Sequence, residues 1–117
     1  MKPRSKKNKG IRLQKWVAKQ ISLMVNIPWG KDLDIRSREA SLSGVDVVLS
    51  DKVKKLFKFS IECKNQENWS VHAWIKQAKS NQEKGTDWLL FAKRNNETPV
   101  VIMDAEVFFK VYSRNLK

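Results

Sequence analysis

Cysteine and histidine are almost missing from this sequence, and its apolar stretches near the N-terminus are interrupted by charges. The one cysteine, Cys63, excludes an internal disulfide and any zinc site built from several thiolates. The one histidine, His72, falls on the polar flank of a predicted helix, where a solvated side chain is more usual than a general base. Because charges break the apolar stretches, we expect neither a signal peptide nor a membrane-spanning helix, and we expect a cytoplasmic protein.

Acidic residues are also scarce, and none occurs before Asp32. An acid-free start is typical of organellar transit peptides, but the same segment carries an apolar stripe that a folded domain needs, so we interpret it as part of the domain. The chain has 24 Lys and Arg against 12 Asp and Glu, a formal net charge of +12. Such a charge attracts polyanions, most often nucleic acid. A ribosomal-type or merely soluble basic protein is the alternative.

The length of 117 residues, 41% of them hydrophobic, is enough for one folded domain and too apolar for a disordered chain. Residues 1–9 are almost all polar or basic, so we expect a flexible basic arm there and a single domain over residues 10–117. The sequence shows no internal repeat and no linker that would divide this domain.

Hydrophobic periodicity predicts the element order α-β-β-β-α-β-β-α. The first helix is predicted from about Gly10 to before Pro28, with Leu13 and Trp16 in its inner stripe. The later elements are predicted at residues 33–40, 45–50 and 55–64 (strands), 70–84 (helix), 88–93 and 99–103 (strands) and after Asp104 (helix). The passage from strand through helix to strand implies a right-handed crossover, so the predicted fold class is mixed α/β, with a mixed central sheet flanked by helices.

Alternating side chains in FKFSIECK, residues 57–64, place Glu62 and Lys64 on the polar face of the third predicted strand. Asp46 lies in the preceding strand, so pairing of the two strands brings the carboxylates of Asp46 and Glu62 together. Two carboxylates at the end of a sheet suit Mg²⁺, and a neighbouring lysine can orient an attacking water and offset charge on a phosphate. This combination favours phosphodiester hydrolysis, although Glu-x-Lys alone is more often a solvated face or a cross-strand ion pair.

Two stretches, SLSGVDVVLS (41–50) and FSIECKNQENW (59–69), resemble the active-site signature of the PD-(D/E)xK nuclease superfamily. The longer stretch RSREASLSGVDVVLS (36–50) is similar to archaeal-type Holliday junction resolvases and to small phage-encoded relatives. WIKQAKSN and LLFAKRN are similar to the phage members. The resemblance, over about residues 10–112, implies a restriction-endonuclease-like core and a Mg²⁺-dependent endonuclease of DNA recombination and repair, in the host cytoplasm if the gene is phage-encoded.

The resemblance also implies roles for individual residues. Asp46 and Glu62 would bind Mg²⁺, for which Mn²⁺ would substitute, and the backbone carbonyl of Cys63 would be a further ligand. Lys64 would position the nucleophilic water. Ser43 matches a serine that lies near the scissile phosphate in the resolvases.

Other positions match less closely or depart from the family pattern. Gln77 matches a helix glutamine that supports the lysine, and Ser41 is a weaker match than Ser43 for the serine. Val45 stands where the motif has proline. The resolvases place a glutamate on the first helix, where this chain offers only Gln14, so chemistry with one metal ion, or help from Glu39, is left open.

Basic residues spread along the chain are candidates for phosphate contacts, and we expect recognition of DNA shape rather than of base sequence. These residues are Lys6, Lys7, Lys9, Arg12, Arg36, Arg38, Lys93 and Arg94. Trp29, in a predicted loop, is the aromatic residue that we expect to contact DNA. Trp16, Trp74 and Trp88 fit core positions better.

Resolution of a four-way junction needs two nicks, so a resolvase is expected to be a homodimer with two matching sites. The apolar residues of VFFKVY, residues 107–112, fit either core burial alone or core burial with a dimer patch. Two alternatives stay open. One is another nicking or flap endonuclease of the superfamily, and the other is a non-catalytic basic nucleic-acid-binding module in which Glu62 and Lys64 only form an ion pair.

Overall fold

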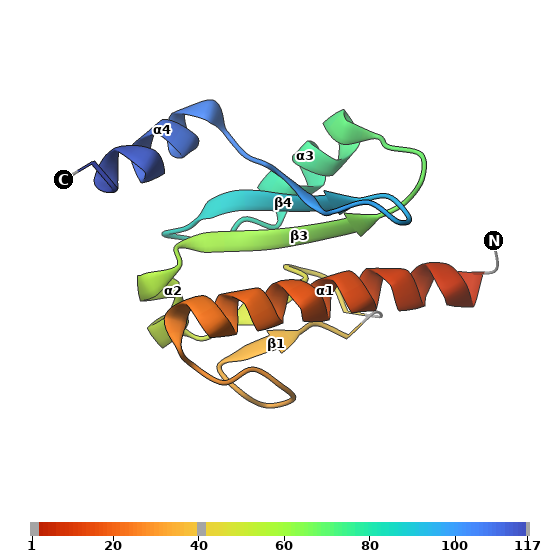
Figure 1. Ribbon diagram of the computed structural model, residues 1–117, viewed down its shortest axis with the longest axis horizontal. Helices are drawn as coiled ribbons and strands as arrows, with labels where there is room; N and C mark the ends of the chain where they lie inside the picture. The colour runs from red at the N-terminus through yellow and green to blue at the C-terminus, as the bar shows by residue number, and fades with distance from the viewer. Residues whose placement is uncertain (1–2, 40–41, 117) are drawn as a thin grey trace.

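A five-stranded mixed sheet in the order β1-β2-β3-β4-β5 forms the centre of the fold (Figure 1). The computed structural model describes residues 3–39 and 42–116, with side chains from Asn8 onward. The strands are β1 Ile35–Ser37, β2 Val47–Leu49, β3 Phe59–Asn65, β4 Asp87–Lys93 and β5 Val100–Ile102. The helices are α1 Pro3–Val25, α2 Asp51–Leu56, α3 Val71–Ser80 and α4 Ala105–Arg114. This arrangement confirms the predicted mixed α/β class and fits a restriction-endonuclease-like core.

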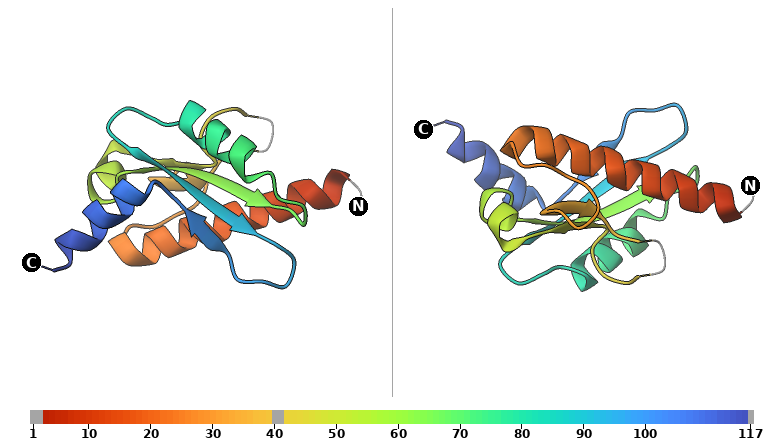
Figure 2. Two further views of the ribbon diagram at one scale, coloured as in Figure 1. Left: turned by 90° about the horizontal axis from the view of Figure 1, so that it is seen from above. Right: turned by 90° about the horizontal axis from the view of Figure 1, so that it is seen from below.

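The chain direction in the sheet follows from the connections between its strands. β2 is antiparallel to both β1 and β3, β3 and β4 are parallel, and β5 returns antiparallel to β4. A parallel pair needs a crossover, and α3 supplies it between β3 and β4. Seen from above and below in Figure 2, α1 and α3 therefore cover opposite faces of the sheet.

Hydrophobic side chains form one core cluster on each face of the sheet. Leu13 and Val17 of α1 belong to a cluster with Ile61 of β3. On the other face, Trp74 of α3 clusters with Leu90 of β4. Each helix therefore buries an apolar stripe against its own face of the sheet, as the helical spacing predicts.

Side chains of the central strand β3 alternate between the two layers. Ile61 and Cys63 belong to the core under α1. Ser60 and Glu62 point the other way, where Ser60 bonds Thr86 at 2.6 Å and Glu62 accepts a hydrogen bond from Asn81. The alternation predicted for this strand is confirmed, and it places Glu62 on the α3 side of the sheet.

The first helix is longer than predicted. α1 begins at Pro3, so residues 3–9, which we expected to form a flexible arm, are helical. Lys and Arg have good helix propensity, and a single glycine at Gly10 costs only about 1 kcal/mol in a helix interior. Trp16 is also placed differently than expected, because 43% of its surface is exposed at the edge of the apolar stripe.

A short helix replaces a predicted turn. α2 occupies Asp51–Leu56, where we predicted a turn and the start of the third strand, and β3 begins only at Phe59. Ser50 caps α2, because its Oγ accepts a hydrogen bond from the backbone N–H of Val53 at 3.4 Å. The other strands and α3 lie within a few residues of the predicted ranges. None of the helices in the described ranges is both long and apolar enough to span a bilayer.

Candidate active site

The backbone of Asp46 is fixed between two neighbouring strands. Its N–H donates to the carbonyl of Ile61 and its carbonyl accepts from the N–H of Arg38, both at 2.8 Å. The preceding turn contains Gly44, whose φ of 106° is strained for any residue with a side chain. A Cβ at Gly44 would lie 3.3 Å from the guanidinium carbon of Arg38, whose Nε donates to the carbonyl of Val45. The glycine therefore allows Arg38 to pack directly beside Asp46.

The carboxyl groups of Asp46 and Glu62 lie close enough for each to change the pKa of the other. Oδ2 of Asp46 accepts a hydrogen bond from the backbone N–H of Cys63 at 2.7 Å. Oε2 of Glu62 accepts from Nδ2 of Asn81 at 3.2 Å, and only 2% of Glu62 is exposed. Strand pairing thus brings both predicted acids into one buried cluster.

Burial gives this carboxyl pair unusual proton affinity. Burial, with the neighbouring charge of Asp46 as the second cause, raises the pKa of Glu62 from 4.5 to about 7. Burial also raises the pKa of Asp46, while the hydrogen bond from Cys63 and the charges of Lys64 and Arg38 oppose the rise. Both carboxyl groups therefore hold their protons to higher pH than free side chains do, and Glu62 is about half protonated near pH 7.

The contact from Asn81 is one that sequence reasoning missed. Asn81 is the C-terminal cap of α3, and the sequence placed it inside a helix that ran to residue 84. Asparagine is common at the ends of helices, which is the signal that could have marked it. Gln77, which we expected to act from this helix, has an exposed side chain one turn earlier.

The remaining predicted residues lie around the carboxyl pair. Lys64 is on the same face of β3 as Glu62, and its charge lowers the pKa of both Glu62 and Asp46. Ser43 is exposed in the turn that leads to Asp46. Ser41 lies outside the described residues. The catalytic roles of Ser43, Lys64 and Gln77 stay predictions.

The oxygen donors of this cluster fit a hard divalent cation. A cation bound between the carboxylates of Asp46 and Glu62 would relieve the repulsion between them. Among the described residues, no group of three or more Asp, Glu, His or Cys side chains gathers in a way that could hold a metal ion. The other ligands would therefore be a backbone carbonyl, water and substrate, a set that suits Mg²⁺.

Gln14, the nearest candidate for the place of the glutamate that the resolvases carry on the first helix, is a neutral amide. Gln14 of α1 is buried, and its Oε1 accepts a hydrogen bond from Oγ of Ser37 at 2.7 Å. Glu39, the alternative acid, is exposed and lines a neighbouring groove. The donor set around Asp46 and Glu62 therefore fits one cation better than two.

A groove of about 810 Å³ beside β1 brings three of the predicted DNA contacts together. They are Trp29, Arg36 and Arg38, which share this groove with Lys15. Trp29 is half-buried, because it also packs against the core under α1. Arg94 lies elsewhere, 5.4 Å above the ring of Trp69.

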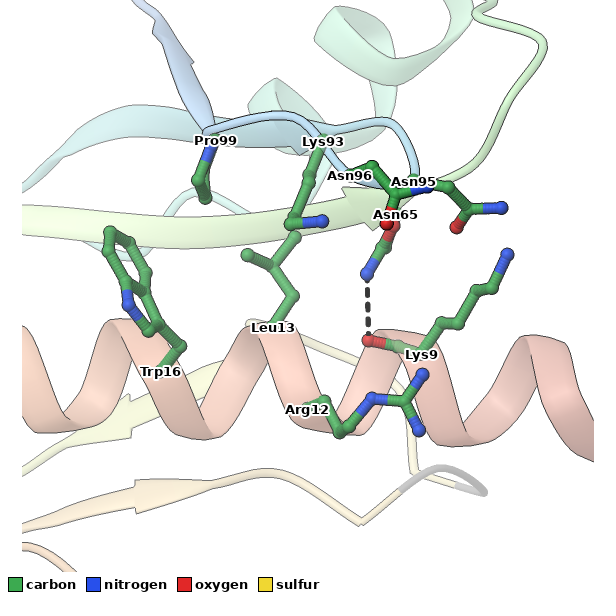
Figure 3. A pocket seen from close by; sticks show the side chains of 9 residues that line it. All are labelled: Lys9, Arg12, Leu13, Trp16, Asn65, Lys93, Asn95, Asn96 and Pro99. Atoms are coloured by element: carbon green, nitrogen blue, oxygen red, sulfur yellow. Dashed lines mark hydrogen bonds between the residues drawn. The ribbon is translucent and has the colours of Figure 1, made fainter.

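Three further predicted contacts, Lys9, Arg12 and Lys93, line a second pocket of about 510 Å³ between α1 and the turn that joins β4 to β5 (Figure 3). Lys6 and Lys7 lie in α1, but their side chains are outside the described part of the chain. Six of the predicted DNA contacts with described side chains thus lie in two places, and Arg94 lies apart from both.

One family model matches residues 5–116, nearly the whole chain, and that family is described as "Phage putative PDDEXK endonuclease". The chain belongs to this family. Membership confirms the resemblance to PD-(D/E)xK nucleases and implies nuclease activity on DNA with a divalent metal ion. No curated protein and no solved structure matches the chain.

The matched range of this PDDEXK endonuclease contains the residues that we predict to be the two acids and the lysine after which the superfamily is named. They are Asp46, directly before β2, and Glu62 and Lys64 of β3, and their roles stay predictions.

Proposed function

We propose that this PDDEXK endonuclease is a Mg²⁺-dependent, structure-specific endodeoxyribonuclease that resolves four-way DNA junctions. The observation that carries the proposal is the buried Asp46–Glu62 carboxyl pair with Lys64 beside it on β3. Two carboxyl groups held together out of water cost folding free energy, so a buried pair with raised pKa values is a strong candidate for a functional site.

Asp46 and Glu62 would hold the metal ion, with the carbonyl of Cys63 as a further ligand. When bound, Mg²⁺ supplies positive charge that makes a bound water more acidic and offsets the charge of the reacting phosphate. The N–H of Cys63 keeps the carboxylate of Asp46 in place, and the amide of Asn81 does the same for Glu62. Both acids are therefore oriented before any substrate arrives.

The neighbouring polar residues complete the proposed chemistry. Lys64, on the face of β3 shared with Glu62, orients the attacking water and offsets negative charge on the phosphate. Ser43 in the exposed turn contacts the phosphate, and Gln77 supports Lys64 from α3. The groove of Trp29, Arg36 and Arg38 binds the DNA backbone on the same side of the molecule as the turn before Asp46.

The raised pKa of Glu62 argues against the non-catalytic alternative. In a binding module in which Glu62 only paired with Lys64, the lysine would lower the pKa of the glutamate. Here burial and Asp46 dominate instead and raise the pKa to about 7. Other nicking or flap endonucleases would use the same carboxyl pair, so only the substrate distinguishes them from a resolvase.

Paired nicks require two active sites, so we propose a two-fold homodimer. The exposed aromatic surface of α4 is available for it, with Phe108, Phe109 and Tyr112 exposed by 48%, 68% and 55%. Contiguous exposed apolar side chains of this kind mark interaction surfaces.

The test is cleavage of a labelled immobile four-way junction and of a linear duplex of the same sequence, in Mg²⁺ and in Mn²⁺. Wild type is compared with Glu62→Gln, which preserves size but removes the charge. Asp51→Asn is the matched control, because the Asp51 side chain is 98% exposed on α2.

Symmetric nicks in the junction by wild type and Asp51→Asn, with cleavage by Glu62→Gln at least 100-fold slower, are the expected result. Equal cleavage of junction and duplex would reject the resolvase and leave a nuclease of another specificity. Cleavage that survives in Glu62→Gln would reject the active site proposed here.

A further inference from the structure

The pocket between α1 and the β4–β5 turn has a composition that the carboxyl site does not explain. Figure 3 shows Trp16 and Leu13 rising from α1 toward the strands, Arg12 lying along the helix, Lys9 extending toward Asn95, and Lys93 and Asn65 at the ends of β4 and β3. Its volume of about 510 Å³ lies in the range of about 300–1,000 Å³ usual for small-ligand sites. The pocket is therefore large enough for a ligand and not only for a bound ion.

The positively charged side chains that line this pocket favour a negatively charged ligand. Lys9, Arg12 and Lys93 supply three positive charges, and the described residues that line the pocket include no Asp or Glu. Nζ of Lys93 donates one hydrogen bond, to the carbonyl of Arg94 at 3.0 Å, which leaves it two further protons. Lysine and arginine side chains that line one pocket without acids are the usual contacts of a phosphate.

The same pocket contains a buried hydrogen-bond acceptor without a partner, which a donor group of the ligand would satisfy. Nδ2 of Asn65 donates to the carbonyl of Lys9 at 3.1 Å, which fixes the side chain between β3 and α1. Oδ1 of Asn65 is buried and has no hydrogen-bond partner among the described residues. A phosphate carries acceptors only, so a ligand that also offers an N–H group, as the nucleobases do, fits this pocket better.

Trp16 gives the pocket an aromatic wall. It lies four residues after Arg12 on α1, so the two side chains share one face of the helix. Trp16 is 43% exposed, although its neighbour Val17 is fully buried. An exposed indole in a pocket lined by cations is the combination with which proteins bind single nucleic-acid strands, by stacking bases and contacting phosphates.

We infer that this pocket binds one nucleotide of the DNA substrate whose base is unpaired, with its phosphate on Lys9, Arg12 and Lys93 and its base on Trp16. This inference rests on the proposed nuclease function and adds the substrate class. Asn65 directly follows Lys64 on β3, and the two side chains face opposite sides of the sheet. Glu62 and Asn65 are three residues apart on β3, so the carboxyl site and the pocket are about 10 Å apart along the strand. A DNA strand that leaves the duplex at a branch is long enough to contact both the carboxyl site and the pocket.

The test is binding without cleavage, in EDTA, measured by fluorescence anisotropy at several salt concentrations. One labelled DNA is a fork with an unpaired arm and the other is a fully paired duplex of equal length. The variants are Trp16→Leu, Trp16→Phe and Lys93→Gln. The matched controls are Leu23→Ala, an exposed apolar residue at the far end of α1, and Lys52→Gln on α2.

We expect Trp16→Leu to bind the fork about tenfold more weakly and the duplex almost unchanged, because base stacking on an aromatic ring is lost. Trp16→Phe retains a ring and should retain most of the affinity, which a loss of folding would not predict. Lys93→Gln should make the salt dependence of fork binding shallower by about one phosphate contact. Both controls should bind both DNAs as wild type does.

If Trp16→Leu and Lys93→Gln bound the fork as tightly as wild type does, the inferred nucleotide pocket would be wrong. The proposed nuclease function would still hold if cleavage required Glu62. Failure of wild type to bind either DNA would overturn both. The last measurement is the binding of a free deoxynucleoside monophosphate. If it bound as tightly as the fork, the ligand would be a free nucleotide and the inferred DNA strand would be wrong.

Discussion

Burial of Glu62 beside Asp46 makes the charge of one residue pair depend on pH in the neutral range. The unfolded chain releases the proton of Glu62 near pH 4.5, whereas the folded chain holds it until about pH 7. The protonated form is therefore stabilised by folding, and this contribution is complete below pH 4.5 and lost as the pH rises through 7. The raised pKa of Asp46 acts in the same direction.

The metal-free protein should accordingly become more stable as the pH falls from 8 to 5. Thermal unfolding in EDTA should show a melting temperature several degrees higher at pH 5 than at pH 8. Glu62→Gln cannot titrate, so its melting temperature should vary much less over the same range. Parallel curves for the two proteins would show that another group controls the pH dependence.

Protons and a divalent ion compete for the same carboxyl oxygens, which gives a second test at the scale of the residue. Addition of Mg²⁺ should raise the melting temperature more at pH 8 than at pH 6, because at pH 6 the ion must displace a proton. Asp46→Asn should abolish the rise at both pH values, while Asp51→Asn retains it. An equal rise in Asp46→Asn would place the ion elsewhere.

Among the elements, the C-terminal end of α3 sets the orientation of Glu62 through Asn81. The hydrogen bond from Asn81 favours the ionised carboxylate and so lowers the pKa of Glu62. In Asn81→Ala we expect the acidic limb of the pH–rate profile for cleavage to move to higher pH. The loss of rate should be larger at pH 6.5 than at pH 8.5.

Ser80→Ala, an exposed substitution in the last turn of α3, is the control for this experiment. Ser80→Ala should have the same pH–rate profile as wild type. A uniform loss of rate in Asn81→Ala at every pH would mean that Asn81 only supports the fold and does not tune Glu62.

Elements with clear periodicity could be predicted from the sequence, and short ones could not. Two core-forming helices and the alternation along β3 are visible because each repeats an apolar pattern over several residues. α2 has six residues, too few to show a helical period, and Ser50 with Asp51 was the one local sign of it. Trp16 falls at the edge of the α1 stripe, where spacing does not decide between core and surface.

Some features of the candidate site could also be predicted from the sequence, and others could not. The meeting of Asp46 and Glu62 follows from strand pairing, and it was predictable because adjacent strands and the motif agree. An asparagine can mark the end of a helix, but its hydrogen bond to Glu62 depends on how α3 packs on the sheet, which the local sequence does not show. The gathering of Lys9, Arg12 and Lys93 is likewise a product of tertiary placement, since α1 and β4 are far apart in the sequence.

At the scale of the whole molecule, the aromatic surface of α4 is what a dimer would bury. Phe108 and Phe109 meet edge to face with ring centroids 5.3 Å apart, and Tyr112 stacks on Phe108 at 6.1 Å. Sedimentation should show a dimer for wild type and a monomer for Phe109→Ser. Leu23→Ser is matched in exposure, at 68%, and should remain dimeric. A wild-type monomer would exclude paired nicking by a preformed dimer.

The position of β3 between two pairing partners limits how this family can vary in length. β2 holds the strand on one side and β4 holds it over seven residues on the other, so its side chains cannot slide. Deletion of Ile61 would turn every later side chain of β3 to the opposite face. The carboxylate of Glu62 would then enter the core under α1, and Cys63 would take its place opposite Asp46. Length changes should therefore be absent from β3 among relatives and be found in the turn at residues 94–98, where the chain leaves the sheet.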